Sequence, residues 1–221
     1  MGKPLGAQAW GIPLALSFCY LLVQIEGSRM GAGHDIVALL SLSTARAWWQ
    51  APWCLLTYGL VHTTWWHFAT NMVILTTLIG SRRLERKEVR CLFTAGILGG
   101  GLLFTLVGNG TLVGASAGIA ALIPLCIYRV TEKHQGWTLL LIVGIVLLDF
   151  LTRNRLSNLP FATHLVGYAI GIGYLLYARS GEARAKREEE QKQVVKKVNT
   201  SGYNSLSNEE QQTLHTSCRH G

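Results

Sequence analysis

The sequence predicts an all-α membrane protein whose chain crosses the bilayer six times. Only 14% of its 221 residues are charged, against about 25% in ordinary soluble domains, so the apolar content exceeds what one water-soluble core needs. A helix needs about 17–25 consecutive apolar residues to span the hydrocarbon of a bilayer. The stretches that approach this length lie at 10–25, 55–79, 91–107, 112–128, 137–151 and 161–178.

The two ends of the chain differ in their expected relation to the bilayer. Residues 1–25 are expected to form the N-terminus and first transmembrane helix, because no clear small-residue cleavage site marks a secretory signal. The stretches at 10–25 and 137–151 are short, so each is either a span or an interfacial helix, and flanking tryptophans suit a lipid interface. Residues 180–221 are charged and polar, and are expected to form a mobile cytoplasmic tail.

Between the first helix and the rest lies a long loop, residues 26–56. It mixes Gly, Ser and His with Trp48, Trp49 and Trp53, a composition typical of a segment that lies at the outer membrane interface. The other five helices are expected within residues 57–179.

Basic residues are distributed unevenly between the two sides that six spans define. Because short basic loops stay in the cytoplasm, both termini are expected to be cytoplasmic. The plain composition and the short loops make the bacterial inner membrane the default expectation. The net charge of +8 follows from this topology and a basic tail, so nucleic acid is not an expected partner. Only four Lys or Arg residues lie on the other side: Arg29, Arg46, Arg153 and Arg155.

The five cysteines show no pattern that would bind a metal. They form no CxxC pair and have no histidine at zinc spacing, so buried thiols are expected, with no metal site and no cofactor. The chain also lacks an internal repeat, which weakens the alternative of a transporter that uses intramembrane histidines as proton relays. The cysteines are Cys19, Cys54, Cys91, Cys126 and Cys218.

Polar side chains inside predicted spans are costly and mark functional sites. In the second span, His67 and Asn71 share one helix face at the i, i+4 spacing, with His62 upstream. Ser116 opens the fourth span and His164 lies early in the sixth. Alternate spans run in opposite directions, so these three spans all start on the outer side and their polar residues can share one depth. A hydroxyl, an imidazole and further donors at one depth suit nucleophilic catalysis with oxyanion stabilisation.

Glycines allow the fourth and sixth spans to approach each other closely. Gly114 precedes Ser116 in a stretch rich in Gly and Ala, and Gly167 with Gly171 forms a GxxxG face, a common device for close helix packing in lipid. His164 lies three residues before Gly167 on the same face. We therefore expect His164 to point at the fourth span.

Each polar residue also has a purely structural interpretation. Taken alone, Ser116 is a common type of packing residue, and His67 with Asn71 can act as polar glue between helices. Asp149 invites assignment as a third catalytic residue, but it lies near an aqueous edge beside two arginines, where a solvated ion pair is the better interpretation. The matched depth of Ser116 and His164 favours the catalytic interpretation for these two.

In this order and at these places, the motifs resemble those of the rhomboid family of intramembrane serine proteases. The resemblance covers roughly residues 53–178. His67 and Asn71 match the HxxxN motif, Ser116 matches GxSx, and THLVGYAIG matches the sixth-span signature. The resemblance implies a six-helix bundle of the rhomboid type.

The same resemblance implies roles for individual residues. Ser116 would attack a peptide carbonyl while His164 takes the proton and returns it. The oxyanion would be held by the Ser116 N–H and the side chains of His67 and Asn71. Near the site, His62 would be a structural histidine, and Glu85 would help order the chain after the second span.

The partners that the resemblance implies are proteins anchored by a single transmembrane helix, cleaved near the outer face. The lipid bilayer is the other expected partner, and no oligomeric state is predicted.

Three positions depart from the family pattern. Ala117 stands where glycine commonly follows the serine, Cys54 where an arginine follows Trp53, and Ala120 where an aromatic residue is often found. A methyl group at Ala117 is expected to crowd the oxyanion site, and the outer loop is expected to lack its ordering arginine. The alternative function is therefore a catalytically weak or inactive rhomboid-like protein that binds transmembrane clients, although such a scaffold has no physical need to retain Ser116 and its partners.

Overall fold

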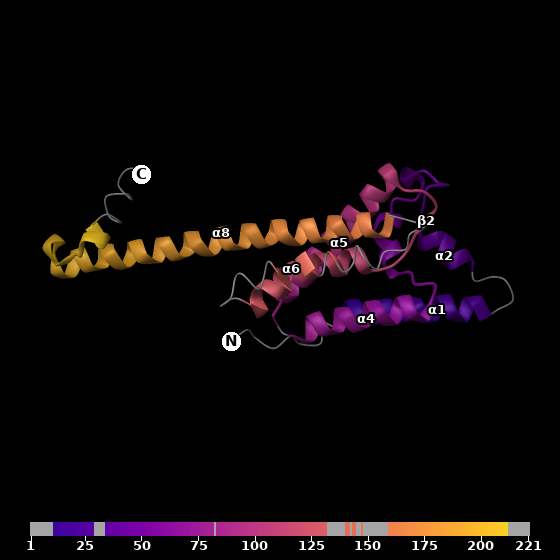
Figure 1. The fold of residues 1–221 in the computed structure, drawn as a ribbon, viewed down its shortest axis with the longest axis horizontal. Coiled ribbons are helices and arrows are strands. Elements are labelled where there is room, and N and C mark those ends of the chain that lie inside the picture. Colours follow the sequence, from indigo (N-terminus) through magenta and orange to yellow (C-terminus); the bar gives the residue numbers. More distant parts are fainter. Residues whose placement is uncertain are drawn as a thin grey trace. The chain divides into compact units, whose positions relative to one another are not determined.

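The computed structural model describes residues 11–28, 34–81, 83–131, 140–141, 143–144, 147 and 159–211. Within them almost all regular structure is helical, as predicted (Figure 1). The chain divides into two compact units, Met1–Leu175 and Leu176–Gly221. With η marking short 3₁₀ helices, the elements of the first unit are α1 (Gly11–Ser28), α2 (His34–Leu40), β1 (Leu42–Ser43), η2 (Trp48–Gln50), α3 (Cys54–Thr57), η3 (Tyr58–Leu60), α4 (Trp65–Gly80), α5 (Arg86–Val107), β2 (Thr111–Leu112), α6 (Ser116–Val130) and the start of α8 (Leu159–Ser201).

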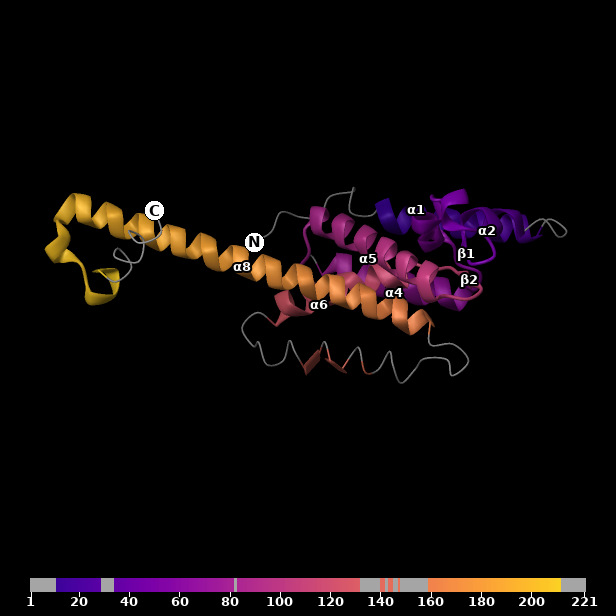
Figure 2. The same ribbon diagram turned by 90° about the horizontal axis from the view of Figure 1, so that it is seen from above.

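Helices α5 and α6 pack against each other and lie side by side in both views (Figures 1 and 2). Helix α4 packs on α6, and α1 packs on α4. The first part of α8 packs on α5, where Gly99 faces Val166 and Ile170, and also on α6 through Gly167. Side chains buried in this core include Leu16, Leu75, Ile97, Phe104 and Leu122.

The second predicted span is shorter than its apolar stretch, 55–79. Residues 54–64 form α3, η3 and an irregular turn, and the long helix starts only at Trp65. Thr64 caps this helix, because its backbone is extended and its hydroxyl accepts a hydrogen bond from the His67 N–H at 3.3 Å, which satisfies one free donor of a helix start. The prediction of one continuous helix over 55–79 is wrong, since apolar content alone cannot reveal such a break.

The outer loop, residues 26–56, contains a strand that the all-α prediction misses. Strand β1 pairs antiparallel with β2, with Leu42 opposite Leu112. Thr44 extends the pairing, since its backbone N–H donates to the carbonyl oxygen of Gly110 at 3.0 Å. Strands of two residues show no alternation of apolar and polar side chains, so the sequence contains no signal for them. The ladder ties the outer loop to the segment that leads into α6.

Two helices in the described part of the chain are long and apolar enough to cross a membrane, Arg86–Val107 and Phe161–Ser201. Gly11–Ile25 and Ser116–Val130 are apolar but shorter. The fifth predicted span, 137–151, falls almost wholly outside the described residues. The helical class is therefore established, and the count of six spans stays a prediction.

The second unit begins within α8, which continues through the charged segment to Ser201. Gly202 ends the helix with φ +81°, a conformation that suits glycine at a helix C-terminus, and its N–H donates to the Val198 carbonyl oxygen at 2.9 Å. After the turn, Glu210 forms an ion pair with Lys197 at 2.8 Å. The expected tail is therefore helical over 180–201, and the chain after it folds back on that helix.

Candidate active site

The hydroxyl of Ser116 and the imidazole of His164 lie within hydrogen-bond distance. Ser116 Oγ is 2.7 Å from His164 Nε2. Ser116 is the first residue of α6 and His164 lies in the first turns of α8, and both side chains are half-buried. The structure thus brings together the two atoms that a nucleophile and its base must place in contact.

Two glycines of α8 set the separation of the helices that carry this pair. A Cβ atom on Gly167 would collide with the carbonyl oxygen of Ala117, and a Cβ atom on Gly171 would also collide with the backbone of α6. Any side chain at these positions would force the helices apart. The GxxxG face therefore lies against α6, at the distance that lets His164 reach Ser116.

The methyl group of Ala117 points at α5. A Cβ atom on Gly100 of α5 would lie only 2.9 Å from the Ala117 Cβ, so the space left by the missing side chain of Gly100 accommodates this methyl. The expectation that the methyl crowds the oxyanion site is corrected accordingly. The methyl of Ala120, a second departure from the family pattern, faces Gly167 of α8.

His67 lies over the backbone just before the serine. Gly114 adopts φ +110°, and a Cβ atom there would lie 2.5 Å from His67 Cε1 and 2.6 Å from Nε2. The Gly114 N–H donates to the carbonyl oxygen of Tyr58 at 2.9 Å, and the Tyr58 hydroxyl donates to the Ile97 carbonyl oxygen at 2.7 Å. Tyr58, which the sequence does not mark, therefore holds the loop before Ser116 on η3 and α5.

His62 links the predicted oxyanion residue Asn71 to the loop before α6. Asn71 Nδ2 lies 2.9 Å from His62 Nε2, and the Ala115 N–H lies 3.5 Å from the same nitrogen. Both groups are donors, so Nε2 acts as the acceptor and the imidazole carries its proton on Nδ1. His62 is fully buried, and its ring also meets the His67 ring at 4.9 Å. The structural role expected for His62 stays a prediction, and Asn71 has one amide hydrogen engaged with His62.

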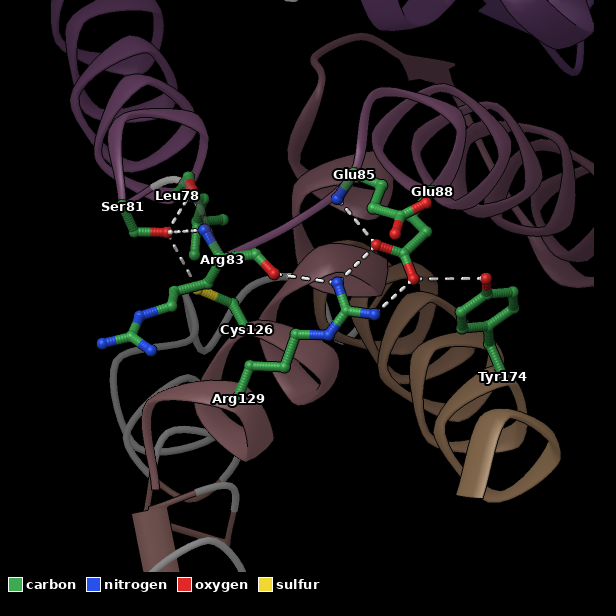
Figure 3. A network of polar contacts seen from close by, with 8 residues as sticks. All are labelled: Leu78, Ser81, Arg83, Glu85, Glu88, Cys126, Arg129 and Tyr174. Carbon is green, nitrogen blue, oxygen red and sulfur yellow. Dashed lines mark hydrogen bonds and ion pairs between the residues drawn. The ribbon is translucent and has the colours of Figure 1, made fainter. Parts of the chain in front are cut away.

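Glu85 is the N-cap of α5 and follows the turn after α4. Its side chain and that of Glu88 form a capping box, in which the Glu85 N–H donates to Glu88 Oε2 at 2.7 Å. Glu88 is buried and binds the guanidinium of Arg129 through both carboxylate oxygens (Figure 3). Glu88 and Arg129 are not among the residues that the sequence marks, because glutamate is not a usual N-cap residue and Glu85 with Glu88 lacks the usual sequence pattern of a capping box.

An arginine reaches Cys54 from elsewhere in the outer loop. Arg46 Nη2 donates to Cys54 Sγ at 3.0 Å and to the Ala38 carbonyl oxygen at 3.4 Å. Trp53 Nε1 and the Cys54 thiol donate to the Leu39 carbonyl oxygen at 2.9 and 3.2 Å. The expectation that this loop lacks an ordering arginine is therefore corrected, because Arg46 supplies the guanidinium.

Two further expectations concern other parts of the chain. Asp149, with the arginines near it, lies outside the described residues. Among the residues that the structure describes, no group of three or more His, Cys, Asp or Glu side chains could hold a metal ion.

Comparison with models of protein families identifies a Rhomboid domain over residues 45–180. This range covers more than half of the chain and contains Ser116, His164, His67 and Asn71. A search of curated proteins finds no match.

Proposed function

Because the chain belongs to the rhomboid family, we propose that it is an intramembrane serine endopeptidase with Ser116 as nucleophile and His164 as general base. The observation that carries the proposal is the 2.7 Å separation between Ser116 Oγ and His164 Nε2. At this distance a neutral imidazole with its proton on Nδ1 can accept the hydroxyl proton as the oxygen attacks.

The proposed reaction has two halves. Ser116 Oγ attacks the carbonyl carbon of a peptide bond, and its proton passes to His164 Nε2. The tetrahedral intermediate then collapses to an acyl-enzyme as His164 gives that proton to the leaving amine. Water attacks the acyl-enzyme with His164 again as base, which releases the carboxylic acid and restores the Ser116 hydroxyl.

Donors for the developing oxyanion are available around the nucleophile. Ser116 is the first residue of α6, where N–H groups have no acceptor within the helix and the helix dipole favours negative charge. The His67 ring lies beside Gly114, two residues earlier. Asn71 has a second amide hydrogen beyond the one that meets His62, and we assign that hydrogen to the oxyanion.

Family membership and the apolar helices indicate an integral membrane protein. Large apolar side chains on its outer faces, such as Leu106 at 81% exposed, suit contact with lipid. Helices α4, α6 and α8 all begin near the Ser116–His164 pair, whereas the exposed Arg83, Lys87 and Arg90 lie where α4 ends and α5 begins. Because basic segments lie in the cytoplasm, the proposed site lies toward the outer face of the membrane. The proposed substrates are proteins held in the membrane by a single transmembrane helix.

The test is fluorophosphonate labelling and cleavage of a model transmembrane substrate by the full-length protein in liposomes. We expect the parent protein to be labelled, and Ser116→Ala to abolish labelling and to reduce cleavage by about 10³-fold or more. His164→Ala should reduce cleavage similarly, because the serine then has no base. Ser180→Ala is the matched control, since Ser180 is exposed and its hydroxyl donates to the Tyr177 carbonyl oxygen on its own helix.

Cleavage that survives Ser116→Ala would contradict the assignment of the nucleophile. A parent protein that binds the substrate without cleaving it, and that Ser116→Ala leaves unchanged, would instead show a scaffold for transmembrane clients.

A further inference from the structure

The interface between α6 and α8 is built from backbone and small side chains at four facing positions. Gly167 and Gly171 present bare backbone to α6, and the facing residues Ala117 and Ala120 are small. Interlocking side chains ordinarily fix the axial register of packed helices, and these four small residues supply none. Polar contacts at the two ends of the interface therefore add to fixing the register, and the Ser116–His164 contact is one of them.

The second polar contact is centred on the carboxylate of Glu88 (Figure 3). Arg129 of α6 donates to Oε2 at 2.5 Å and to Oε1 at 2.6 Å, and the Tyr174 hydroxyl of α8 donates to Oε1 at 3.4 Å. Glu88 is only 6% exposed. One carboxylate thus joins α5, α6 and α8, at the end of α6 opposite Ser116.

The charges in this cluster lie where the helix dipoles favour them. Glu88 is in the first turn of α5 and Arg129 in the last turn of α6. A bidentate pair of guanidinium and carboxylate is specific in geometry, and a buried carboxylate that loses its partner is costly. Arg129 Nη1 also donates to the Arg83 carbonyl oxygen at 2.8 Å. Few arrangements satisfy all these groups, which suits the cluster to hold its helices in one register.

We propose that Glu88 is a positioning residue for the Ser116–His164 pair, holding α6 through Arg129 and α8 through Tyr174. The inference rests on the proposed function of that pair. Ser116 and Arg129 are about 20 Å apart along α6, at about 1.5 Å per residue, so Glu88 acts through the helices and not by contact. Loss of the cluster removes this constraint on α8, so that α8 shifts relative to α6 and His164 Nε2 moves away from Ser116 Oγ.

The first test compares Tyr174→Phe with Tyr20→Phe in the full-length protein in liposomes. Tyr174→Phe removes the hydroxyl that joins α8 to Glu88 and leaves the Glu88–Arg129 pair intact. We expect kcat for a transmembrane substrate to fall about three- to tenfold, with KM unchanged. Amide hydrogen exchange at 116–120 and 164–168 should become faster. Tyr20, whose ring stacks on Phe68 at 4.2 Å, controls for the loss of a tyrosine hydroxyl and should change neither quantity.

A second variant removes the charge. Glu88→Gln keeps the size of the side chain and an acceptor for Tyr174, and it leaves Arg129 without its anion, so we expect a larger loss of kcat and faster exchange at the same amides. Glu190→Gln is its control, because Glu190 lies in an exposed pair with Lys186 on α8.

Unchanged exchange at 116–120 and 164–168 in both Tyr174→Phe and Glu88→Gln would overturn the inference. If the parent protein shows no cleavage that depends on Ser116, the proposed function fails, and the exchange comparison still decides whether Glu88 holds the register of α6 and α8.

Discussion

Gly114 lies two residues before Ser116 and adopts φ +110°, a backbone conformation that residues other than glycine rarely adopt. The edge of the His67 ring occupies the space where a Cβ atom would be. The position of the His67 side chain therefore depends on the absence of a side chain at Gly114 as well as on the contacts of His67 itself. The same holds at Gly167, where α6 and α8 touch through backbone.

Replacing Gly114 with alanine should therefore displace His67. The added Cβ atom would lie 2.5 Å from His67 Cε1, and backbone strain of about 1–3 kcal/mol adds to the clash. If His67 is the oxyanion donor that we propose, its displacement lowers kcat by about 10²-fold, measured with a transmembrane substrate in liposomes.

Gly110→Ala is the control for Gly114→Ala. Gly110 also has a positive φ, +92°, but a Cβ atom there would meet nothing within 4 Å. Equal losses of kcat in the two variants would show that backbone strain, and not the contact with His67, is responsible.

At the scale of elements, α2 is held by side chains that satisfy its last carbonyl groups. The carbonyl oxygens of Ala38, Leu39 and Leu40 accept hydrogen bonds from Arg46, from Trp53 with Cys54, and from Thr57. A helix leaves its last four carbonyls without partners in the helix, and a guanidinium there also meets the negative end of the dipole. These hydrogen bonds connect the outer loop to α3. The next element, η3, comes shortly before His62 in the chain, and its residue Tyr58 accepts a hydrogen bond from the Gly114 N–H. The donor atoms are Arg46 Nη2, Trp53 Nε1, Cys54 Sγ and Thr57 Oγ1.

Arg46→Ala should loosen α2 without unfolding the bundle. Loss of a charged hydrogen-bond donor predicts a cost of about 1–3 kcal/mol, and amide hydrogen exchange across 34–43 should become faster than in the parent protein. Arg90→Ala serves as the comparison, because Arg90 is an exposed arginine of α5. If exchange over 34–43 is the same in both variants, Arg46 does not hold the loop.

At the scale of the whole molecule, the chain consists of two compact units with different stabilising forces. The first is held by apolar packing and glycine contacts between helices. The second is a charged helical segment whose return is held by Glu210, which accepts from Lys197 at 2.8 Å and from the Ser207 N–H at 2.7 Å. Its stability should therefore respond to pH.

Two hydrogen bonds lower the pKa of Glu210 below its ordinary value. The one from Lys197 has the larger effect and the one from the Ser207 N–H the smaller. A lowered folded-state pKa contributes stability that is present above the pKa of the unfolded state and is lost as pH falls through the folded value. We expect a nitroxide at Asn204→Cys, in a background depleted of cysteine, to gain mobility on acidification below the usual titration range of glutamate, about pH 4.3. In Glu210→Gln the nitroxide should be mobile already at neutral pH, whereas Glu182→Gln, at an exposed glutamate earlier in α8, should behave like the parent. Mobility that is independent of pH in the parent would refute the prediction.

Most of the helices and the identity of the candidate site could be predicted from the sequence. Long apolar stretches predict helices from local sequence alone. Polar residues are rare in such stretches, so four of them are conspicuous: His67, Asn71, Ser116 and His164. The family motifs add their order along the chain, and the match over residues 45–180 confirms the family. These signals are local in sequence, so one chain without coordinates suffices to detect them.

Only the tertiary structure decided how distant residues complete one another. Arg129 reaches Glu88 and Arg46 reaches Cys54, while the methyl of Ala117 is accommodated by a glycine of α5. In each case the sequence around one residue contains no pattern that identifies its partner. Their pairing depends on how the helices pack. A charge that is buried in a low-dielectric interior needs a partner of opposite charge or a hydrogen-bond partner, and two helices can approach closely only where one of them has a glycine or another small residue.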